Sequence, residues 1–200
     1  MKTDKKSLEK ALPYILLVAG TIGLIASLII LNDTFKLAAD PNYHPSCSLN
    51  PIISCGSVMK SSEAHLLGFN NPYMGVIAFP VLLTIGLVLL AGAKLKRWFW
   101  LGLNFGALLG VIFVHYLFVA SVYHIHALCP YCIIVWVVTI TTFWYVTLYN
   151  LESGNITLHP SLHRAHRSVR RHHADILVVW LLVITVLILT HFWYFFGRNL

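Results

Sequence analysis

Five long apolar segments, separated by shorter polar stretches, dominate the pattern of hydrophobic and polar positions along the chain. Each has at least 21 consecutive residues without Asp, Glu, Lys or Arg, over residues 11–31, 72–93, 98–123, 127–149 and 176–196. A helix of about 20 apolar residues crosses a hydrocarbon core roughly 30 Å thick. The pattern therefore predicts an all-α membrane protein with five transmembrane helices.

The composition agrees with this interpretation. Of the 200 residues, 58% are hydrophobic and 10% are charged, whereas about 25% of the residues of a soluble domain are charged. Because the five segments use more than half of the chain, we expect no second globular domain.

The positive charges are distributed unevenly between the polar segments. Eleven of the 14 basic residues precede the first span, follow the second or follow the fourth: Lys2, Lys5, Lys6, Lys10, Lys94, Lys96, Arg97, Arg164, Arg167, Arg170 and Arg171. If the spans alternate, all eleven lie on one side, and the positive-inside rule makes that side cytoplasmic. The N-terminus is then inside and the C-terminus outside, and the net charge of +7 is a topology signal rather than evidence for nucleic-acid binding.

The same topology brings the four cysteines to the outer face. Cys47 and Cys55 fall in the long loop of residues 32–71, and Cys129 and Cys132 lie at the outer end of the fourth span. Disulfides form and persist in oxidising compartments. Spacing and topology leave three interpretations open, which are a thiol–disulfide relay, structural disulfides and a Cys₄ zinc site.

The Cys-Pro-Tyr-Cys motif of residues 129–132 favours the relay. Pro130 suits the first turn of a helix, which predicts that Cys129 lies at or next to the N-cap. The helix dipole then stabilises the thiolate of Cys129. Cys132 is one turn deeper on the same helix face, so one thiol faces the aqueous loop and the other faces the membrane.

The ordered set of motifs resembles the vitamin K epoxide reductase family over residues 10–150. It comprises CSLNPIISCGSVMKSSEAHLLGFNNPYMG at residues 47–75, with an N-P-x-x-G that opens the second span, and CPYC at the start of the fourth. The resemblance implies a catalytic four-helix bundle over residues 1–150 around a quinone pocket. It leaves residues 151–200 as a basic cytoplasmic linker and a fifth transmembrane helix.

The resemblance also implies roles for individual residues. Cys129 and Cys132 match the active-site pair, with Cys132 nearest the quinone, and Cys47 and Cys55 match the pair that shuttles electrons from a partner. Asn71 matches a quinone-contacting asparagine. Trp136 stands where vertebrate members have a quinone-binding tyrosine. An indole can stack on a quinone and donate one N–H, but it cannot act as a phenol, which counts against epoxide reduction.

These roles imply a membrane thiol–disulfide oxidoreductase that supports disulfide bond formation in the bacterial cell membrane. Electrons would pass from a separate extracytoplasmic thioredoxin-fold (DsbA-like) partner to a quinone of the menaquinone, ubiquinone or phylloquinone type. The chain ends at Leu200, just past the fifth span, so that partner is expected to be a separate protein. The alternatives are a quinone or quinone-epoxide reductase with quinol as its main output, and a non-enzymatic, disulfide-stapled membrane scaffold.

Four further expectations concern polar residues and the loop. Asn104 and His115, at membrane depth, are expected to form hydrogen bonds between helices, with a functional role as the alternative. His126 is a candidate to stabilise the Cys129 thiolate, with an ordinary interfacial histidine as the alternative. Residues 57–67 are predicted to form a short amphipathic helix anchored on the membrane by Val58, Met59, Leu66 and Leu67. The linker histidines are expected to face lipid headgroups, with metal binding as the alternative: His159, His163, His166, His172 and His173.

Overall fold

The computed structural model describes residues 2–40, 42–66, 68–157 and 168–193. Among its α-helices are α1 Lys2–Ala39, α2 Cys55–Met59, α3 Pro72–Leu90, α4 Arg97–Val119, α5 Pro130–Glu152 and α7 His173–His191. A 3₁₀ helix, η1 Ser62–His65, follows α2, and a π-helix, η2 Ala120–Ile125, continues α4. In the described ranges, five helices are long and apolar enough to cross a membrane, which confirms the five predicted spans.

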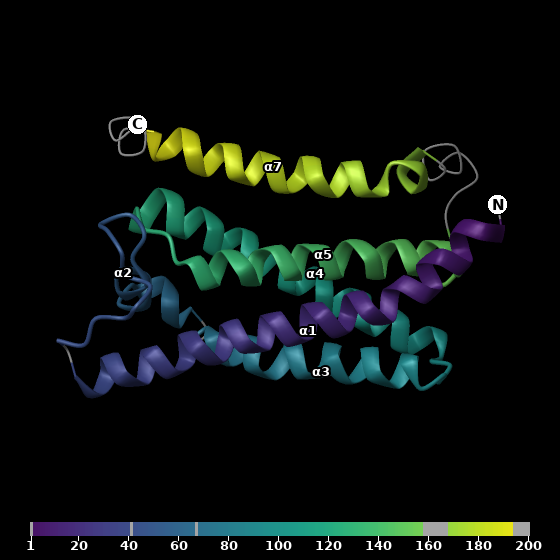
Figure 1. Ribbon diagram of the computed structural model, residues 1–200, viewed down its shortest axis with the longest axis horizontal. Coiled ribbons are helices and arrows are strands. Elements are labelled where there is room, and N and C mark those ends of the chain that lie inside the picture. The colour runs from purple at the N-terminus through teal and green to yellow at the C-terminus, as the bar shows by residue number, and fades with distance from the viewer. Residues whose placement is uncertain (1, 41, 67, 158–167, 194–200) are drawn as a thin grey trace.

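The long helices run side by side as an elongated bundle, with the short helix α2 at one end (Figure 1). Helix α1 packs along α3 and α5, and α4 packs along α5. Helix α7 lies outside this group, on the side of α4 and α5 away from α1 and α3 (Figure 1). The four-helix bundle is therefore formed by α1, α3, α4 and α5, and α7 is a fifth helix applied to one face.

Two glycines let the backbones of α1 and α3 approach closely. A Cβ atom on Gly20 of α1 would lie 2.7 Å from the backbone nitrogen of Leu83. A Cβ atom on Gly86 of α3 would lie 2.9 Å from the carbonyl oxygen of Pro13. Lipid offers no hydrophobic drive for helix association, so close packing at small residues supplies much of the attraction.

Polar side chains inside the bundle bond to neighbouring helices, as predicted. Asn150 of α5 is fully buried, and its amide donates to Asn104 Oδ1 at 3.2 Å and to the carbonyl oxygen of Trp100 at 3.1 Å. His115 of α4 accepts a hydrogen bond from Trp180 Nε1 of α7 at 3.1 Å. Both predicted interhelical hydrogen bonds, those of Asn104 and His115, are confirmed.

The prediction of one amphipathic helix over residues 57–67 is wrong. The segment divides into the end of α2, a turn at Lys60 and the 3₁₀ helix Ser62–His65, and Leu67 lies outside the described residues. Met59 is buried against Cys47, Cys55 and Cys129, so it anchors the loop to protein rather than to lipid.

Several helix ends also differ from the apolar segments. Helix α1 continues past Leu31 to Ala39 because Ile30 and Leu37 both pack on the same cluster at the loop end. Five residues of the predicted cytoplasmic linker lie outside the described residues: His159, His163, Arg164, His166 and Arg167. The last residues of the fifth predicted span, 194–196, are outside them as well.

Candidate redox site

Cys129 occupies the N-cap of α5, as the motif predicted. Its backbone is extended (φ −106°, ψ 120°), Pro130 is the first helical residue, and the carbonyl oxygen of Cys129 accepts from the N–H of Ile133 at 3.1 Å. Proline fits here because the first N–H groups of a helix have no intrahelical acceptor. The local sequence therefore sets the start of α5 at the motif.

The environment of Cys129 favours its thiolate. The pKa of the Cys129 thiol lies below its usual value, chiefly because the Cys132 thiol donates a hydrogen bond to its sulfur. The backbone N–H groups of Tyr131 and Cys132 act in the same direction, while burial and the negative charge of Asp33 oppose them. A lowered pKa increases the thiolate fraction, and the thiolate is the nucleophile in disulfide exchange.

The loop presents its two cysteines as a disulfide. Cys47 and Cys55 are bonded to each other, while Cys129 and Cys132 are free thiols. Cys55 is the first residue of α2, whose N-cap, Ser54, accepts a hydrogen bond at its hydroxyl from the Ser57 N–H at 3.2 Å. The four cysteines therefore form two pairs, one oxidised and one reduced.

A backbone bridge joins the loop to the start of α5. The N–H of Leu128 donates to the carbonyl oxygen of Ile52 at 2.7 Å, and the N–H of Ser54 donates to the carbonyl oxygen of Leu128 at 2.9 Å. This is an isolated parallel bridge between Ile53 and Leu128. Cys55 and Cys129 follow these two hydrogen-bonded segments. The bridge therefore holds the two cysteines next to each other.

The result of this bridge is a direct contact between the two cysteine pairs. The Sγ atoms of Cys55 and Cys129 lie 3.2 Å apart. Cys55 is 0% exposed and Cys129 1% exposed, so the contact is closed to water. Of the two loop cysteines, Cys55 is the one whose sulfur is placed for exchange with the CPYC motif.

An apolar cavity of about 910 Å³ begins at the free thiols and runs between α3 and α4. Cys129, Cys132, Trp136 and Asn71 line it at the loop end. Its lining continues along α4 through Gly102 and Gly106 to Trp98, near the start of that helix. The cavity is therefore a long apolar space that reaches both thiols of the motif.

Asn71 lines this cavity and carries an unused acceptor. It is the N-cap residue of α3, and its side-chain Nδ2 donates to the carbonyl oxygen of Glu63 at 2.6 Å. Its Oδ1 atom is buried and has no hydrogen-bond partner among the described residues, and the same holds for Oδ1 of Asn70. A buried acceptor without a donor costs free energy, so this end of the cavity suits a ligand that carries a hydroxyl group.

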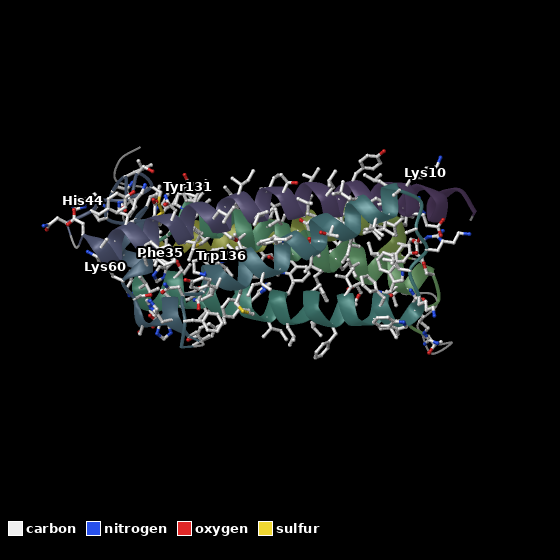
Figure 2. The ribbon with its side chains drawn as sticks, turned by 90° about the horizontal axis from the view of Figure 1, so that it is seen from below. Lys10, Phe35, His44, Lys60, Tyr131 and Trp136 are labelled. Atoms are coloured by element: carbon white, nitrogen blue, oxygen red, sulfur yellow. A yellow bond between two sulfur atoms is a disulfide. The ribbon has the colours of Figure 1, made fainter. Side chains whose placement is uncertain are left out.

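Trp136 lies on α5, one turn beyond Cys132, and lines the same cavity. Its side chain is 4% exposed, and its ring meets that of Phe118 edge to face, with centroids 5.7 Å apart. Figure 2 shows Trp136 and Tyr131 toward the end that carries the loop and Lys10 toward the opposite end. All six predicted site residues therefore lie at or near that end, which we call the cysteine end.

Two contacts at the cysteine end escaped the sequence analysis. Asp33 of α1 is buried, and its Oδ1 accepts a hydrogen bond from the Tyr43 hydroxyl at 2.9 Å. Its place directly after the first apolar segment suggested only the end of that span. The His126 ring, a candidate partner for Cys129, instead stacks on His191 of α7, with Nδ1 of His126 3.2 Å from Nε2 of His191.

In the described part of the chain, no group of three or more His, Cys, Asp or Glu side chains is arranged to hold a metal ion. The geometry supports exchange between a buried disulfide and a thiol pair of which Cys129 is buried and Cys132 half-buried, next to an apolar cavity. This is a disulfide-relay arrangement in chemical terms.

Comparison with models of known protein families gives a match. The model of the vitamin K epoxide reductase family matches residues 14–147, which is more than half of the chain. The matched range contains the four cysteines, Asn71 and Trp136, and it ends before α7 begins. No curated protein matches the chain.

Proposed function

Since this chain belongs to the vitamin K epoxide reductase family, we propose that it passes electrons from a thiol-bearing partner protein to a membrane quinone through its two cysteine pairs. The family makes it an integral membrane thiol–disulfide oxidoreductase. The partner, the quinone and the direction of transfer belong to the proposal. The observation that carries it is the 3.2 Å separation of the Cys55 and Cys129 sulfur atoms.

In the first proposed step, a partner thiolate attacks Cys47 Sγ, and Cys55 leaves as a thiolate. The second thiol of the partner, as its thiolate, then attacks the partner sulfur of the mixed disulfide and releases Cys47. The partner leaves oxidised, and the loop holds two thiols. Cys47 is 7% exposed, so this step requires the loop around it to open toward the partner, which we propose is a thioredoxin-fold protein.

In the second step, the Cys55 thiolate attacks Cys129 Sγ of the oxidised motif, and Cys132 leaves as a thiolate. Cys47 then attacks Cys55, which re-forms the loop disulfide and releases Cys129. The arrangement of the structure, with an oxidised loop and a reduced motif, corresponds to the state after this exchange. Once the Cys132 thiolate has taken up a proton, its thiol can donate a hydrogen bond to Cys129, which supports the departure of Cys129 because a better stabilised thiolate leaves more readily.

In the third step, Cys129 and Cys132 close their disulfide and give up two electrons and two protons. A quinone supplies the acceptor for both when it is bound. The cavity fits such a group because it is apolar and reaches Cys132. Asn71 Oδ1, which lacks a donor among the described residues, would accept a hydrogen bond from a hydroxyl group of the quinol. Trp136 would form the wall of the cavity beside the quinone ring.

A pair of double variants tests the proposed route between the cysteine pairs. The variant Cys47→Ser with Cys132→Ser leaves Cys55 and Cys129, which should form a disulfide under mild oxidation. The matched control, Cys55→Ser with Cys132→Ser, leaves Cys47 and Cys129, which should remain thiols under the same conditions. Mass spectrometry of non-reduced peptides after thiol alkylation distinguishes the two.

Equal disulfide yields in the two variants, or a higher yield in the control, would remove the support for Cys55 as the exchanging residue. The direction of transfer needs a second experiment, in which purified protein receives a reduced protein dithiol and a quinone. Quinone reduction that depends on both Cys47 and Cys132 supports the oxidase direction. Quinone reduction that proceeds with Cys47→Ser as fast as with the native chain would contradict the relay.

A further inference from the structure

Helix α7 is outside the residues that match the family, and most of its surface is exposed. Exposed apolar side chains lie along most of its length, among them Val179, Leu182, Val183 and Val186. Such a surface faces lipid, which is as apolar as the helix, so burial of apolar area does little to hold it on the bundle. What fixes α7 must therefore be specific contacts.

The contact at mid-depth is made by His115 of α4, whose two ring nitrogens each form a hydrogen bond. Nδ1 of His115 lies 2.8 Å from the carbonyl oxygen of Val111, to which it donates, and Nε2 accepts from Trp180 Nε1 of α7 at 3.1 Å. The two rings lie 5.6 Å apart between centroids. Loss of either partner would leave a polar atom unpaired at membrane depth, which is costly.

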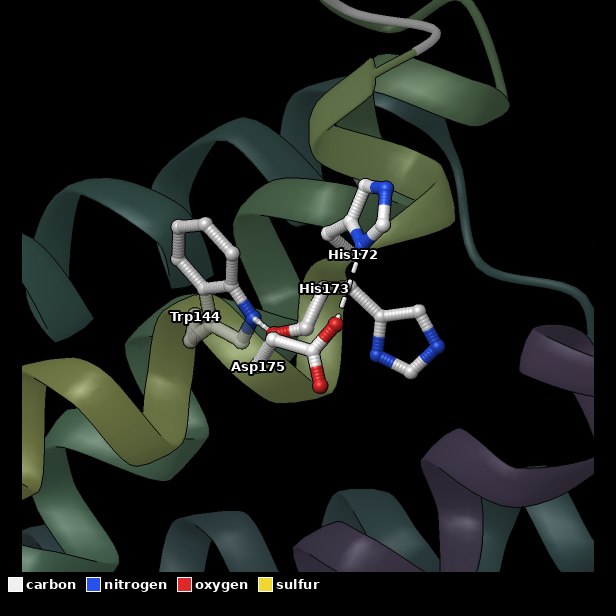
Figure 3. A network of polar contacts seen from close by, with 4 residues as sticks. All are labelled: Trp144, His172, His173 and Asp175. Carbon is white, nitrogen blue, oxygen red and sulfur yellow. Dashed lines mark hydrogen bonds and ion pairs between the residues drawn. The ribbon is translucent and has the colours of Figure 1, made fainter.

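Two more contacts hold the ends of α7. At the cysteine end, the stacked pair of His126 and His191 joins α7 to the turn before Cys129. At the opposite end, Trp144 Nε1 of α5 donates to the carbonyl oxygen of His173 at 2.9 Å (Figure 3). Bonds at three depths fix both the height of α7 along the bundle and its rotation about its own axis.

The side chain held between α7 and the cavity is Trp136. Ile184 and Trp180 of α7 pack on the hydrophobic cluster that contains Trp136 and Phe118. A narrow gap between α7 and the bundle is lined by His115, Phe118, Trp136 and Ile184. Since Trp136 also lines the large cavity beside Cys132, its indole has α7 behind it and the cavity in front of it.

We propose that α7 is a positioning element for Trp136. By this inference, the Trp180–His115 bond and the packing of Ile184 fix the indole and thereby set the width of the cavity next to Cys132. The identity of the group in the cavity rests on the function proposed above, whereas the effect of α7 on Trp136 does not. Trp180, His115 and Ile184 are positioning residues because they act through Trp136.

The direct test observes Trp136 without any ligand. The full chain, labelled with fluorotryptophan, contains six tryptophans, and the ¹⁹F resonance of Trp136 is assigned from the loss of one signal in Trp136→Phe. We expect Trp180→Phe, His115→Phe and Ile184→Ala each to shift or broaden this resonance. His115→Gln retains an acceptor for Trp180, so it should restore the native signal.

The matched control is Trp193→Phe, the same substitution on an exposed residue just beyond the end of α7, which should leave the Trp136 resonance unchanged. Ile184→Ala keeps all polar contacts and remains informative if the polar variants fold poorly. Unchanged Trp136 resonances in Ile184→Ala and in the folded polar variants, or an equal change in Trp193→Phe, would overturn the inference.

The second readout separates positioning from stability. We expect Trp180→Phe to raise KM for a quinone roughly threefold to sixteenfold with kcat retained, which is the equivalent of the about 0.6–1.7 kcal/mol that a hydrogen bond between membrane helices contributes. A proportional loss of kcat, with KM unchanged, would indicate only a smaller folded fraction and count against positioning. If the resonance moves but no variant, nor the native chain, reduces quinone, the proposed function fails while the role of α7 stands.

Discussion

At the scale of single residues, the reactivity of Cys129 depends on one neighbouring thiol. The Cys132 thiol is the largest cause of the lowered pKa of Cys129, and the two sulfurs belong to the same helix turn. The backbone N–H groups at the start of α5 also lower the pKa of Cys129, while burial and the charge of Asp33 raise it. Cys132 thus lowers the pKa of Cys129, in addition to being its partner in the proposed disulfide.

We therefore expect Cys132→Ala to raise the pKa of Cys129, whereas Cys132→Ser, whose hydroxyl can still donate, should keep it low. Both are made with Cys47 and Cys55 changed to serine, so that Cys129 is the single thiol. The ultraviolet absorbance of the thiolate during a pH titration gives the midpoint. Below the ordinary thiol pKa, the Ser variant should retain more thiolate than the Ala variant, and equal midpoints would assign the effect to the helix instead.

The Tyr43–Asp33 bond is the second residue-scale feature with a measurable consequence. Tyr43→Phe leaves the buried Asp33 carboxylate without this donor and loosens the loop before Cys47. Reduction of the loop disulfide by a small dithiol should then be faster than in the native chain. Asp33→Asn keeps an acceptor and should react at the native rate, and a native rate in Tyr43→Phe would mean that other contacts hold the loop.

At the scale of elements, two glycines on neighbouring helices have opposite surroundings. A Cβ on Gly86 of α3 would meet the backbone of α1 at 2.9 Å, whereas a Cβ on Gly106 of α4 has no atom within 4 Å. Gly86→Ala should therefore lower stability by about 1–3 kcal/mol, and Gly106→Ala should not lower it. Unfolding of the two variants in the same detergent tests this, and similar losses in both would contradict the described packing of α1 on α3.

The same open space at Gly106 allows a test of whether the cavity holds the tail of a quinone. Gly106→Leu places a large side chain in the apolar space between α3 and α4 that Gly106 lines, without a clash at the backbone. We expect the variant to fold and to show a several-fold higher KM for a quinone with a long isoprenoid tail. KM for a tailless quinone should stay near the native value, and equal increases for both would mean that the ring, rather than the tail, occupies this part of the cavity.

Sequence reasoning succeeded where the determinants of an element are local. Pro130 and Cys129 fix the start of α5 by their own backbone chemistry, and the lengths of the apolar segments fix the spans. It failed for residues 57–67 because Met59 looks like a lipid anchor in the sequence, although it is buried by cysteines from two other segments. Local amphipathicity does not reveal which partner will cover an apolar side chain.

For the whole molecule, the order of the cysteines predicted two pairs at one end but not the atom-level contact between them. That contact depends on the bridge between Ile53 and Leu128, which is made by backbone groups and has no side-chain signature. The packing of α7 on Trp136 was likewise hidden, because the faces of α7 that meet lipid and protein are both apolar. The reactive residues were thus easier to predict from the sequence than the contacts that bring them together.

The orientation of the whole bundle in the membrane remains a prediction of the charge pattern, and two exposed lysines can test it. Lys60 lies toward the cysteine end and Lys10 toward the opposite end (Figure 2). In a chain whose four cysteines are changed to serine, Lys60→Cys should react with a membrane-impermeant maleimide on intact cells. Lys10→Cys should react only after the cells are permeabilised, because the basic segments stay on the cytoplasmic side.

Labelling of Lys10→Cys but not Lys60→Cys on intact cells would show that the topology is the inverse of the predicted one. The cysteine pairs would then face a reducing compartment, where disulfides rarely persist, and the proposed partner could not be an extracytoplasmic protein. Lys94→Cys, between α3 and α4, provides an independent control, since it should behave as Lys10→Cys does. Agreement of all three sites would place the Cys55–Cys129 contact on the oxidising side, which the proposed direction of electron transfer requires.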